Sequence, residues 1–260
     1  MDRIKKAAQI LYDARLRRQQ IEQLPEDCAP GSLAEGYAVQ TALISLIGDT
    51  VVGWKVGCIS PESQRRARTT EPFSGPVLSR DLYNSGCEVQ PNAYFSCALQ
   101  AEFALKLTRS LLATNAPFTL QAVRDAVGGV LPALEIADCR FSESATIGAP
   151  SLIADGAKSG ILIVSDCKAD LHEMDLVQHV VVLHVNGRAV AQGCGGKVMG
   201  DPLKSLHWLA NSMAKRGESL VAGQLVSTGT CTGSYMAVPG DEVIADYGSL
   251  GRVEACLSRN

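Results

Sequence analysis

The 260-residue chain has no stretch approaching the roughly 20 consecutive apolar residues that a membrane-spanning helix needs. It also has no surplus of one charge, because 24 lysines and arginines stand against 27 aspartates and glutamates, for a formal net charge of −3. Proteins that bind nucleic acid or an anionic membrane surface carry a marked excess of basic residues. We therefore expect no nucleic acid and no membrane as a partner, and a small molecule instead.

The nine cysteines include no C-x-x-C pair, which excludes the common zinc-finger spacings. Their number is odd and their positions are scattered from Cys28 to Cys256, unlike a disulfide framework. Most have apolar neighbours in the sequence and are expected to be small buried side chains. Because free thiols persist in a reducing compartment, the sequence predicts a cytoplasmic protein.

Helical patterns occupy the first part of the chain. Residues 1–24 carry an apolar stripe at helical spacing, which predicts one helix. Ser32 and Glu35 have the spacing of a capping box, which predicts a second helix over about 33–47. The chain is therefore expected to begin with two helices, separated by a helix-breaking segment, PEDCAPG, at 25–31.

Strand patterns dominate the rest of the chain. Residues 51–59 predict a buried strand, whereas residues 60–80, rich in proline and glycine, predict a loop with one short helix. Strand patterns then continue from about residue 85, interrupted by helical patterns at about 118–128 and 202–216. Many strands with few helices, out of strict alternation, favour an α+β fold over a doubly wound sheet.

Three oxygen-bearing side chains lie within these strand patterns. The strand expected over 96–107 alternates apolar and polar residues, as a strand with one buried face does, and contains Gln100 and Glu102. Residues two apart on a strand share a face, so these two side chains point the same way. Glu135 would add a third oxygen ligand for a hard cation. The alternative is three solvated side chains on an edge strand, and spacing alone does not exclude it.

Six segments in a fixed order carry a resemblance to a known family. They are GWKVG (53–57), QAEFALKL (100–107), ALEIADCRF (133–141), IADGAKSG (153–160), GDPLKSLHWLA (200–210) and the TGTCTG…PGD run (228–241). The set resembles the 2-hydroxypenta-2,4-dienoate hydratase / 4-oxalocrotonate decarboxylase branch of the fumarylacetoacetate hydrolase superfamily, over roughly residues 30–257.

The resemblance implies a fold and an organisation for the chain. The expected fold is a mixed β-roll, like the C-terminal domain of fumarylacetoacetate hydrolase, preceded by N-terminal helices. The chain would be a single domain over 1–260, with a helical segment at about 1–48 and a β-roll catalytic core at about 50–258. A homo-oligomer is the expected assembly.

The same resemblance implies a metal site. In that family a Glu-x-Glu pair and a later acidic residue bind Mg²⁺ or Mn²⁺. The matching positions in this sequence are Gln100, Glu102 and Glu135. Gln100 stands where the family has glutamate, and an amide oxygen binds a divalent cation without the attraction of a full negative charge. We therefore expect Mg²⁺ or Mn²⁺ to bind weakly.

Two lysines and two loops acquire roles from the resemblance. Lys55, in GWKVG, matches a lysine that lines the active site, and Lys158, in GAKSG, matches one that stands near the metal in hydrolase and oxaloacetate-decarboxylase members. From the pattern alone, Lys55 could be a strand-edge lysine that reaches water, and Lys158 a solvated loop lysine. The substrate-binding residues implied by the same segments are Ser159, Thr228, Gly229 and Thr230.

The function expected from these residues is a metal-assisted hydratase, similar to 2-keto-4-pentenoate hydratase, acting on a small 2-oxo or 2-hydroxydienoic acid. Lys55 would move a proton on the carbon chain of the substrate. Hydrolysis of a C–C bond is disfavoured, because hydrolases of the superfamily use a histidine well before the metal strand. The first of the four histidines here is His172.

Two rival functions remain open. Decarboxylation of a 2-oxo-3-enedioate, as by 4-oxalocrotonate decarboxylase, would share the same enolate, and Lys158 favours it. A non-catalytic homologue that only binds a 2-oxo acid is the other. Three departures from the hydratase pattern support that second rival: Gln100, Gly156, and Phe73 at a position where many hydratases have aspartate.

Overall fold

The computed structural model of the protein describes residues 2–142, 147–166 and 168–259. Its α-helices are α1 (Arg3–Arg17), α2 (Leu33–Ile47), α3 (Pro61–Ala67), α4 (Leu120–Ala126), α5 (Ala149–Ala154) and α6 (Pro202–Lys215). Its strands are β1 (Val51–Gly57), β2 (Phe73–Leu78), β3 (Leu82–Asn84), β4 (Cys87–Val89), β5 (Ala98–Leu107), β6 (Val127–Ala137), β7 (Ile161–Val164), β8 (Val180–Val185), β9 (Arg188–Cys194), β10 (Leu225–Thr230), β11 (Tyr235–Met236), β12 (Glu242–Asp246) and β13 (Arg252–Leu257).

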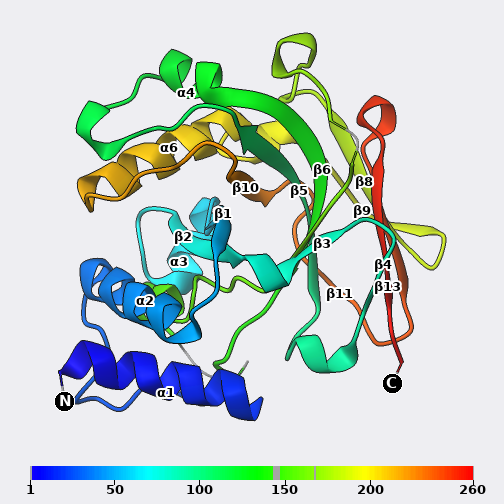
Figure 1. The fold of residues 1–260 in the computed structure, drawn as a ribbon. Helices are drawn as coiled ribbons and strands as arrows, with labels where there is room; N and C mark the ends of the chain where they lie inside the picture. Colours follow the sequence, from blue (N-terminus) through cyan, green and yellow to red (C-terminus); the bar gives the residue numbers. More distant parts are fainter. Residues whose placement is uncertain (1, 143–146, 167, 260) are drawn as a thin grey trace.

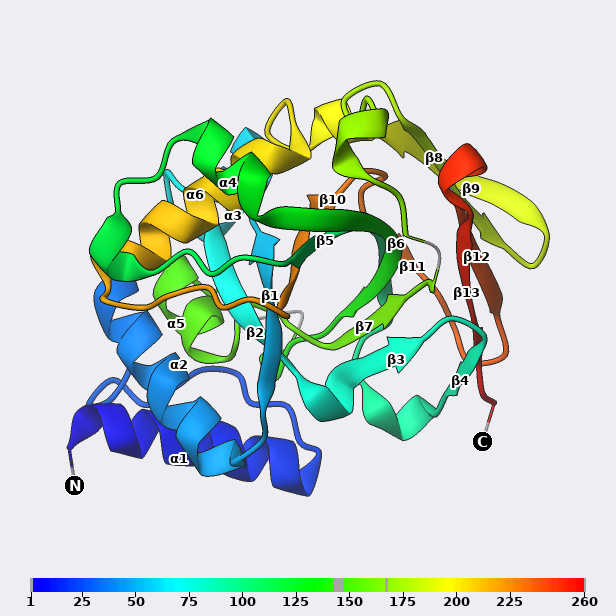
Figure 2. The ribbon, with the colours of Figure 1, turned by 45° about the horizontal axis from the view of Figure 1, so that its top comes forward.

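The strands form two mixed sheets. The larger sheet has the order β2-β1-β10-β5-β6-β7-β3, with β11 paired to β5, and the smaller has the order β4-β13-β12-β8-β9. Figure 1 shows the larger sheet curled into a half-barrel, with the smaller sheet beside it and the α1–α2 pair at the opposite side of the molecule. Figure 2 shows α5 lying beside α2. The predicted α+β class, a mixed β-roll preceded by helices, is confirmed.

The helix predicted over 33–47 is confirmed as α2. The Ser32 hydroxyl oxygen accepts a hydrogen bond from the Glu35 N–H at 3.2 Å, so the serine caps the first turn. In a capping box the Glu35 carboxylate would accept from the Ser32 N–H. Here it accepts from the N–H of the preceding residue, Gly31, at 2.6 Å. Gly48 closes the helix in the left-handed conformation, with φ of +68°.

Two other predictions, for residues 1–24 and 60–80, are right about the helices α1 and α3 but wrong about the rest of each segment. The helix expected over 1–24 ends after Arg17. The chain beyond it pairs with a distant segment, where the Ile21 N–H donates to the Arg140 carbonyl at 2.8 Å. The expected loop over 60–80 contains strand β2 as well as helix α3. Pro76 suggested a loop, but β2 lies at the edge of its sheet, where a strand tolerates proline.

Strand β5 is a central strand whose middle is covered on both faces, so the prediction of one buried face is wrong. Glu102 and Phe103 point to opposite faces, and both are fully buried. On the face of Phe103, the rings of His179 and Tyr247 pack edge-on at 5.8 and 5.4 Å between centroids. The smaller sheet therefore covers one face of β5, and the polar residues on the other face are buried by different contacts.

The described buried residues form a large apolar core, a second core around the N-terminal helices, and a small third cluster within the larger sheet. The large core includes Phe103, Tyr247 and Leu206 and reaches both sheets and α6. The second core joins α1, α2 and α5. The division into a helical segment and a catalytic core within one domain stays a prediction. No helix among the described residues has the length and apolar character to cross a membrane.

Thiol titration of the denatured, non-reduced protein is expected to count nine free thiols. The eight cysteines within the described residues are free, and Cys167 lies outside them. Burial raises the pKa of several thiols, Cys97 to about 12, which keeps them protonated and unreactive. A count of seven or fewer, with disulfide-linked peptides in the mass spectrum, would contradict this prediction.

Candidate active site

Four neighbouring strands of the larger sheet, β1, β10, β5 and β6, bring the candidate residues together. Lys55 on β1 is paired with Ser227 on β10. Gln100 on β5 lies directly opposite Glu135 on β6. Glu102 is two residues after Gln100 and shares its face of the sheet. Side chains separated by up to 172 positions in the sequence thus meet on one face because of the strand order.

Glu102 is fully buried, and only one of its two carboxylate oxygens has hydrogen-bond partners. Its Oε2 atom accepts hydrogen bonds from the Ser227 hydroxyl at 2.6 Å and from the Gly229 N–H at 2.9 Å. Its Oε1 atom is buried and has no hydrogen-bond partner among the described residues. A buried oxygen without a partner costs free energy, so its presence points to a ligand at this position.

Glu135 lies beside Lys55. The Lys55 ammonium nitrogen is 3.2 Å from Glu135 Oε2, and the two residues are 4% and 2% exposed. The contact has the distance of an ion pair but not the direction of a hydrogen bond, so Oε2 retains an unused lone pair. The ammonium donates instead to the Ala157 carbonyl oxygen at 3.3 Å.

The electrostatics of the two carboxyl groups favour a positive ligand. Burial, followed by the nearby charge of Glu135, raises the pKa of Glu102 to about 8, against the opposing effect of Lys55. Burial also raises the pKa of Glu135, and Lys55 opposes this shift. A divalent cation would relieve the repulsion and contact the unpartnered oxygens. The donor set, all oxygen, is the kind that Mg²⁺ and Mn²⁺ prefer.

The third predicted ligand is an amide. The Gln100 Nε2 group donates to the Ser234 hydroxyl at 2.7 Å, which fixes the orientation of the amide. The amide oxygen is not used by this hydrogen bond and could bind a cation. Among the described residues, no group of three or more histidine, cysteine, aspartate or glutamate side chains could hold a metal. A metal site on this face would therefore contain two carboxylates and the amide.

Of the other predicted residues, Gly229 joins this group through the hydrogen bond from its N–H to Glu102, and the side chains of the remaining four form no hydrogen bond or ion pair with the two glutamates. Lys158 is exposed, and its ammonium has no hydrogen bond or ion pair with any described residue. The Ser159 hydroxyl donates to the Pro76 carbonyl at 2.6 Å, and the Thr228 hydroxyl to the Phe103 carbonyl at 3.0 Å. The Thr230 hydroxyl donates to the Gly233 carbonyl at 2.9 Å. Their roles in substrate binding stay predictions.

Sequence reasoning missed two residues that contact the group. Ser227 donates to Glu102, and its place as a polar residue in the strand that leads into the predicted loop at 228–233 was a usable signal. Tyr247 lies on the opposite face of the sheet, where its hydroxyl contacts the carbonyl oxygens of Glu102 and Ala133 at 2.6 and 2.7 Å. No local pattern identified this tyrosine.

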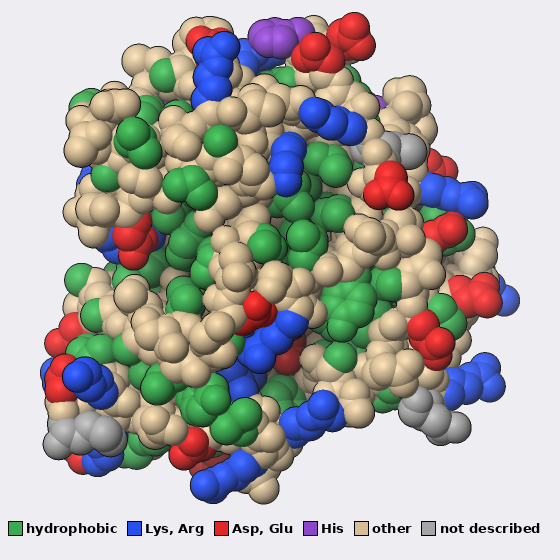
Figure 3. Space-filling model, viewed as in Figure 1, with side chains coloured by type: hydrophobic (Ala, Val, Ile, Leu, Met, Phe, Trp, Pro, Cys, Tyr) green, Lys and Arg blue, Asp and Glu red, His purple; other side chains and the backbone are tan. Residues whose placement is uncertain are grey.

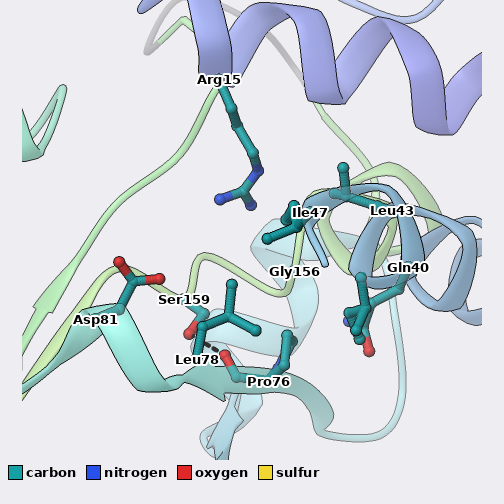
Figure 4. A pocket seen from close by; sticks show the side chains of 10 residues that line it. Arg15, Gln40, Leu43, Ile47, Pro76, Leu78, Asp81, Gly156 and Ser159 are labelled. Carbon is teal, nitrogen blue, oxygen red and sulfur yellow. Dashed lines mark hydrogen bonds between the residues drawn. The ribbon is translucent and has the colours of Figure 1, made fainter. Parts of the chain in front are cut away.

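Two cavities in the described part of the chain lie away from the two glutamates. A cleft of about 970 Å³ runs between α2 and α6 and is lined by Tyr37, Trp208 and Lys204 among others. Figure 3 shows a hollow with apolar side chains between the part of the surface formed by α6 and that formed by α2. The second cavity, beside Arg15 and Ser159, measures about 10 Å³ and cannot hold an organic acid (Figure 4). Neither cavity is lined by Lys55, Glu102 or Glu135, so we place the candidate site by its chemistry.

A curled mixed sheet that buries two carboxylates and a lysine on adjoining strands defines a mixed β-roll protein with a buried polar site. The profile of the family described as "Fumarylacetoacetate (FAA) hydrolase C-terminal" matches residues 91–258. The chain belongs to this family.

Two curated relatives and one solved structure show how far the likeness extends. The chain is 29% identical over 251 residues to 4-oxalocrotonate decarboxylase of Pseudomonas putida, covering 95% of this chain and 94% of the relative. It is 30% identical over 258 residues to 2-keto-4-pentenoate hydratase of Paraburkholderia xenovorans, covering 98% of this chain and 94% of the relative. The structure of 4-oxalocrotonate decarboxylase from Pseudomonas putida G7, complexed with magnesium and adipate, matches with a TM-score of 0.91 at 29% identity, covering 97% of this chain and 96% of that one.

Proposed function

We propose that the protein is a metal-assisted lyase that adds water to a small 2-hydroxydienoic acid or its 2-oxo tautomer. The observation that carries this proposal is the buried group of Glu102, Glu135 and Lys55, in which each carboxylate keeps one oxygen without a hydrogen-bond partner. Similarity over nearly the whole chain to hydratases and decarboxylases of such acids supports it.

Glu102, Glu135 and the amide oxygen of Gln100 are the residues that would hold Mg²⁺ or Mn²⁺. When bound, the cation would draw negative charge from the carboxylate and 2-oxo oxygens of the substrate. The hydrogen bonds from Ser227 and the Gly229 N–H hold Glu102 in place and limit its rotation. With only two carboxylates, the site would bind the cation weakly until the substrate adds its own carboxylate.

Lys55 would hold and transfer the proton on the carbon chain. Its ammonium is fixed between Glu135 Oε2 and the Ala157 carbonyl, so it can donate a proton toward the space in front of the carboxylates. A positioned acid–base group of this kind accelerates a reaction by about 10²–10⁴-fold. Lys158, Ser159 and Thr230 would form the wider rim of the substrate site, whereas Thr228 is fully buried and would support the strand behind it.

Decarboxylation of a 2-oxo-3-enedioate is the second candidate, and the position of Phe73 favours it. Phe73 is 4% exposed. A Cβ atom on Gly57 would lie 3.3 Å from both the Lys55 ammonium and the Phe73 ring, so the ring flanks the lysine. An apolar ring offers no hydrogen bond to orient an attacking water, whereas loss of CO₂ from the substrate needs no such water.

A substrate screen distinguishes these reactions. We expect the protein with Mg²⁺ or Mn²⁺ to remove the ultraviolet band of a 2-hydroxydienoic acid, and EDTA to abolish the change. Loss of the band without CO₂, and with the hydrated product in the mass spectrum, indicates hydration, whereas release of CO₂ from an enedioate indicates decarboxylation. Metal-dependent binding of the acids with no turnover of any of them would show a non-catalytic homologue and contradict the proposal.

A further inference from the structure

Three consecutive residues next to the candidate site adopt a left-handed backbone. The φ angles are +88° at Gly156, +59° at Ala157 and +62° at Lys158. Side-chain-bearing residues rarely take this conformation, and a run of them persists only where the surrounding structure holds it. The run, called here the left-handed turn, presents the Ala157 carbonyl oxygen to the Lys55 ammonium at 3.3 Å.

The left-handed turn directly follows Asp155, whose carboxylate and carbonyl groups are bound by two arginines. The Arg140 Nε group donates to both carboxylate oxygens of Asp155 at 2.8 and 2.9 Å, and its backbone N–H donates to one of them at 2.9 Å. The Asp155 carbonyl oxygen accepts from Nη2 of Arg15 at 2.6 Å and from Nη2 of Arg140 at 3.0 Å. Asp155 is fully buried and Arg140 is 3% exposed, so both charges are paired away from water.

Arg15 comes from outside the β-roll. It lies in the last turn of α1, beyond the residues 91–258 that the family profile covers, and reaches down to the turn (Figure 4). Its Nη2 atom also contacts the Asp155 carboxylate at 3.2 Å. A Cβ atom on Gly156 would lie only 3.3 Å from this Nη2 atom, so glycine permits the close approach. The N-terminal helix thus contacts the segment that orients Lys55.

We propose that Arg15, together with Arg140 and Asp155, positions Lys55 by holding the left-handed turn that presents the Ala157 carbonyl oxygen to the lysine. Arg15 is a positioning residue, because none of its hydrogen bonds or ion pairs is with Glu102, Glu135 or Lys55. The effect on turnover rests on the proposed function, in which Lys55 transfers the proton. The effect on the conformation of Lys55 is independent of the proposed function.

The test compares Arg15→Met with Arg17→Met. Both substitutions remove a cation from the last turn of α1, but Arg17 is exposed and has no hydrogen bond or ion pair with a described residue. The first readout is the rate at which an amine-specific reagent modifies Lys55, with Lys106 as an internal reference. We expect Arg15→Met to raise the rate at Lys55 several-fold, and hydrogen exchange over 153–160 to rise with it. Arg17→Met is expected to change neither.

The second readout is turnover of the substrate found by the screen. A displacement of a reacting group by about 1 Å can cost about 100-fold in rate. Because Arg140 still holds Asp155 in the variant, we expect kcat to fall about tenfold in Arg15→Met with KM within about twofold, since binding contacts stay intact. Arg15→Lys keeps a cation that can reach the Asp155 carbonyl and is expected to restore part of the loss.

The outcomes separate this inference from the proposed function. A folded Arg15→Met whose labelling of Lys55 and exchange over 153–160 match those of Arg17→Met overturns the inference. If Arg15→Met fails to fold, the same comparison between Arg15→Gln and Arg17→Gln decides it, because the shorter, uncharged glutamine removes the cation that binds Asp155. If the parent protein turns over none of the acids, the proposed function fails, whereas the labelling and exchange results still decide whether Arg15 positions Lys55.

Discussion

Lys55→Met is expected to lower turnover by about 10²–10⁴-fold while the protein keeps its fold, because a positioned acid–base group contributes on that scale. Methionine keeps the length and the apolar stem of lysine but cannot exchange a proton. It also removes the cation 3.2 Å from Glu135 and the donor to the Ala157 carbonyl. Steady-state kinetics on the substrate found by the screen measure the loss, and circular dichroism with thermal unfolding establishes that the fold is intact.

The matched control is Lys106→Met. Lys106 lies on β5, and its ammonium donates to the Gly223 carbonyl, away from the two glutamates. We expect this variant to keep turnover within about twofold of the parent, since surface substitutions of this kind have small effects. A folded Lys55→Met with near-parental turnover would mean that another group transfers the proton, and the assignment of Lys55 would be abandoned.

Gln100→Glu is expected to tighten the binding of Mn²⁺ by one to two powers of ten, or about 1.4–3 kcal/mol. The substitution adds a third carboxylate opposite Glu135, on the face that already carries Glu102. The Ser234 hydroxyl, which now accepts from the amide at 2.7 Å, can turn to donate to the new carboxylate. Isothermal titration calorimetry with Mn²⁺ on both proteins, with and without oxalate as a chelating mimic of a 2-oxo acid, measures the change.

The control for this charge is Gln192→Glu, on an exposed position of β9 in the other sheet. It adds the same negative charge to the molecule but is expected to leave the affinity for Mn²⁺ unchanged, because exposed charges are screened beyond about 10 Å. Oxalate is expected to tighten binding to the parent more than to Gln100→Glu, since the parent lacks the third carboxylate. Equal affinities of Gln100→Glu and the parent would show that residue 100 does not face the metal.

Several features followed from the sequence because they depend on residues close together. Ser32 and Gly48 marked the ends of α2, since a cap acts on the first or last turn of its own helix. Gln100 and Glu102 were assigned to one face of a strand, which the period of two requires of any strand. The resemblance of six ordered segments supplied the family and the β-roll.

Other features needed the tertiary structure, because they depend on which distant segments pair. Helix α1 ends at its cap residue Arg18, which takes a left-handed conformation (φ +51°) although it is not glycine, and the chain beyond it pairs with a distant segment through Ile21 and Arg140. Whether Glu102 was solvated or buried depended on the segments that pack on its own face of β5, among them Ser227 and Gly229 of β10, which donate to its carboxylate. Strand register is set by packing and turns over the whole sheet, and no pattern within one strand encodes it.

The sequence by itself therefore determined which side chains we propose for the chemistry, namely Gln100, Glu102, Glu135 and Lys55, and that Gln100 and Glu102 share a face of their strand. The tertiary structure alone decided their contacts. The parallel pairing of β1 with β10 brings Lys55 within 3.2 Å of a carboxylate 80 positions away, and the same sheet brings Ser227 to Glu102. It also decided that Arg15, on a helix outside the β-roll, reaches the turn behind Lys55. Long-range contacts of this kind form only when the whole chain folds, because burial and strand order hold them together.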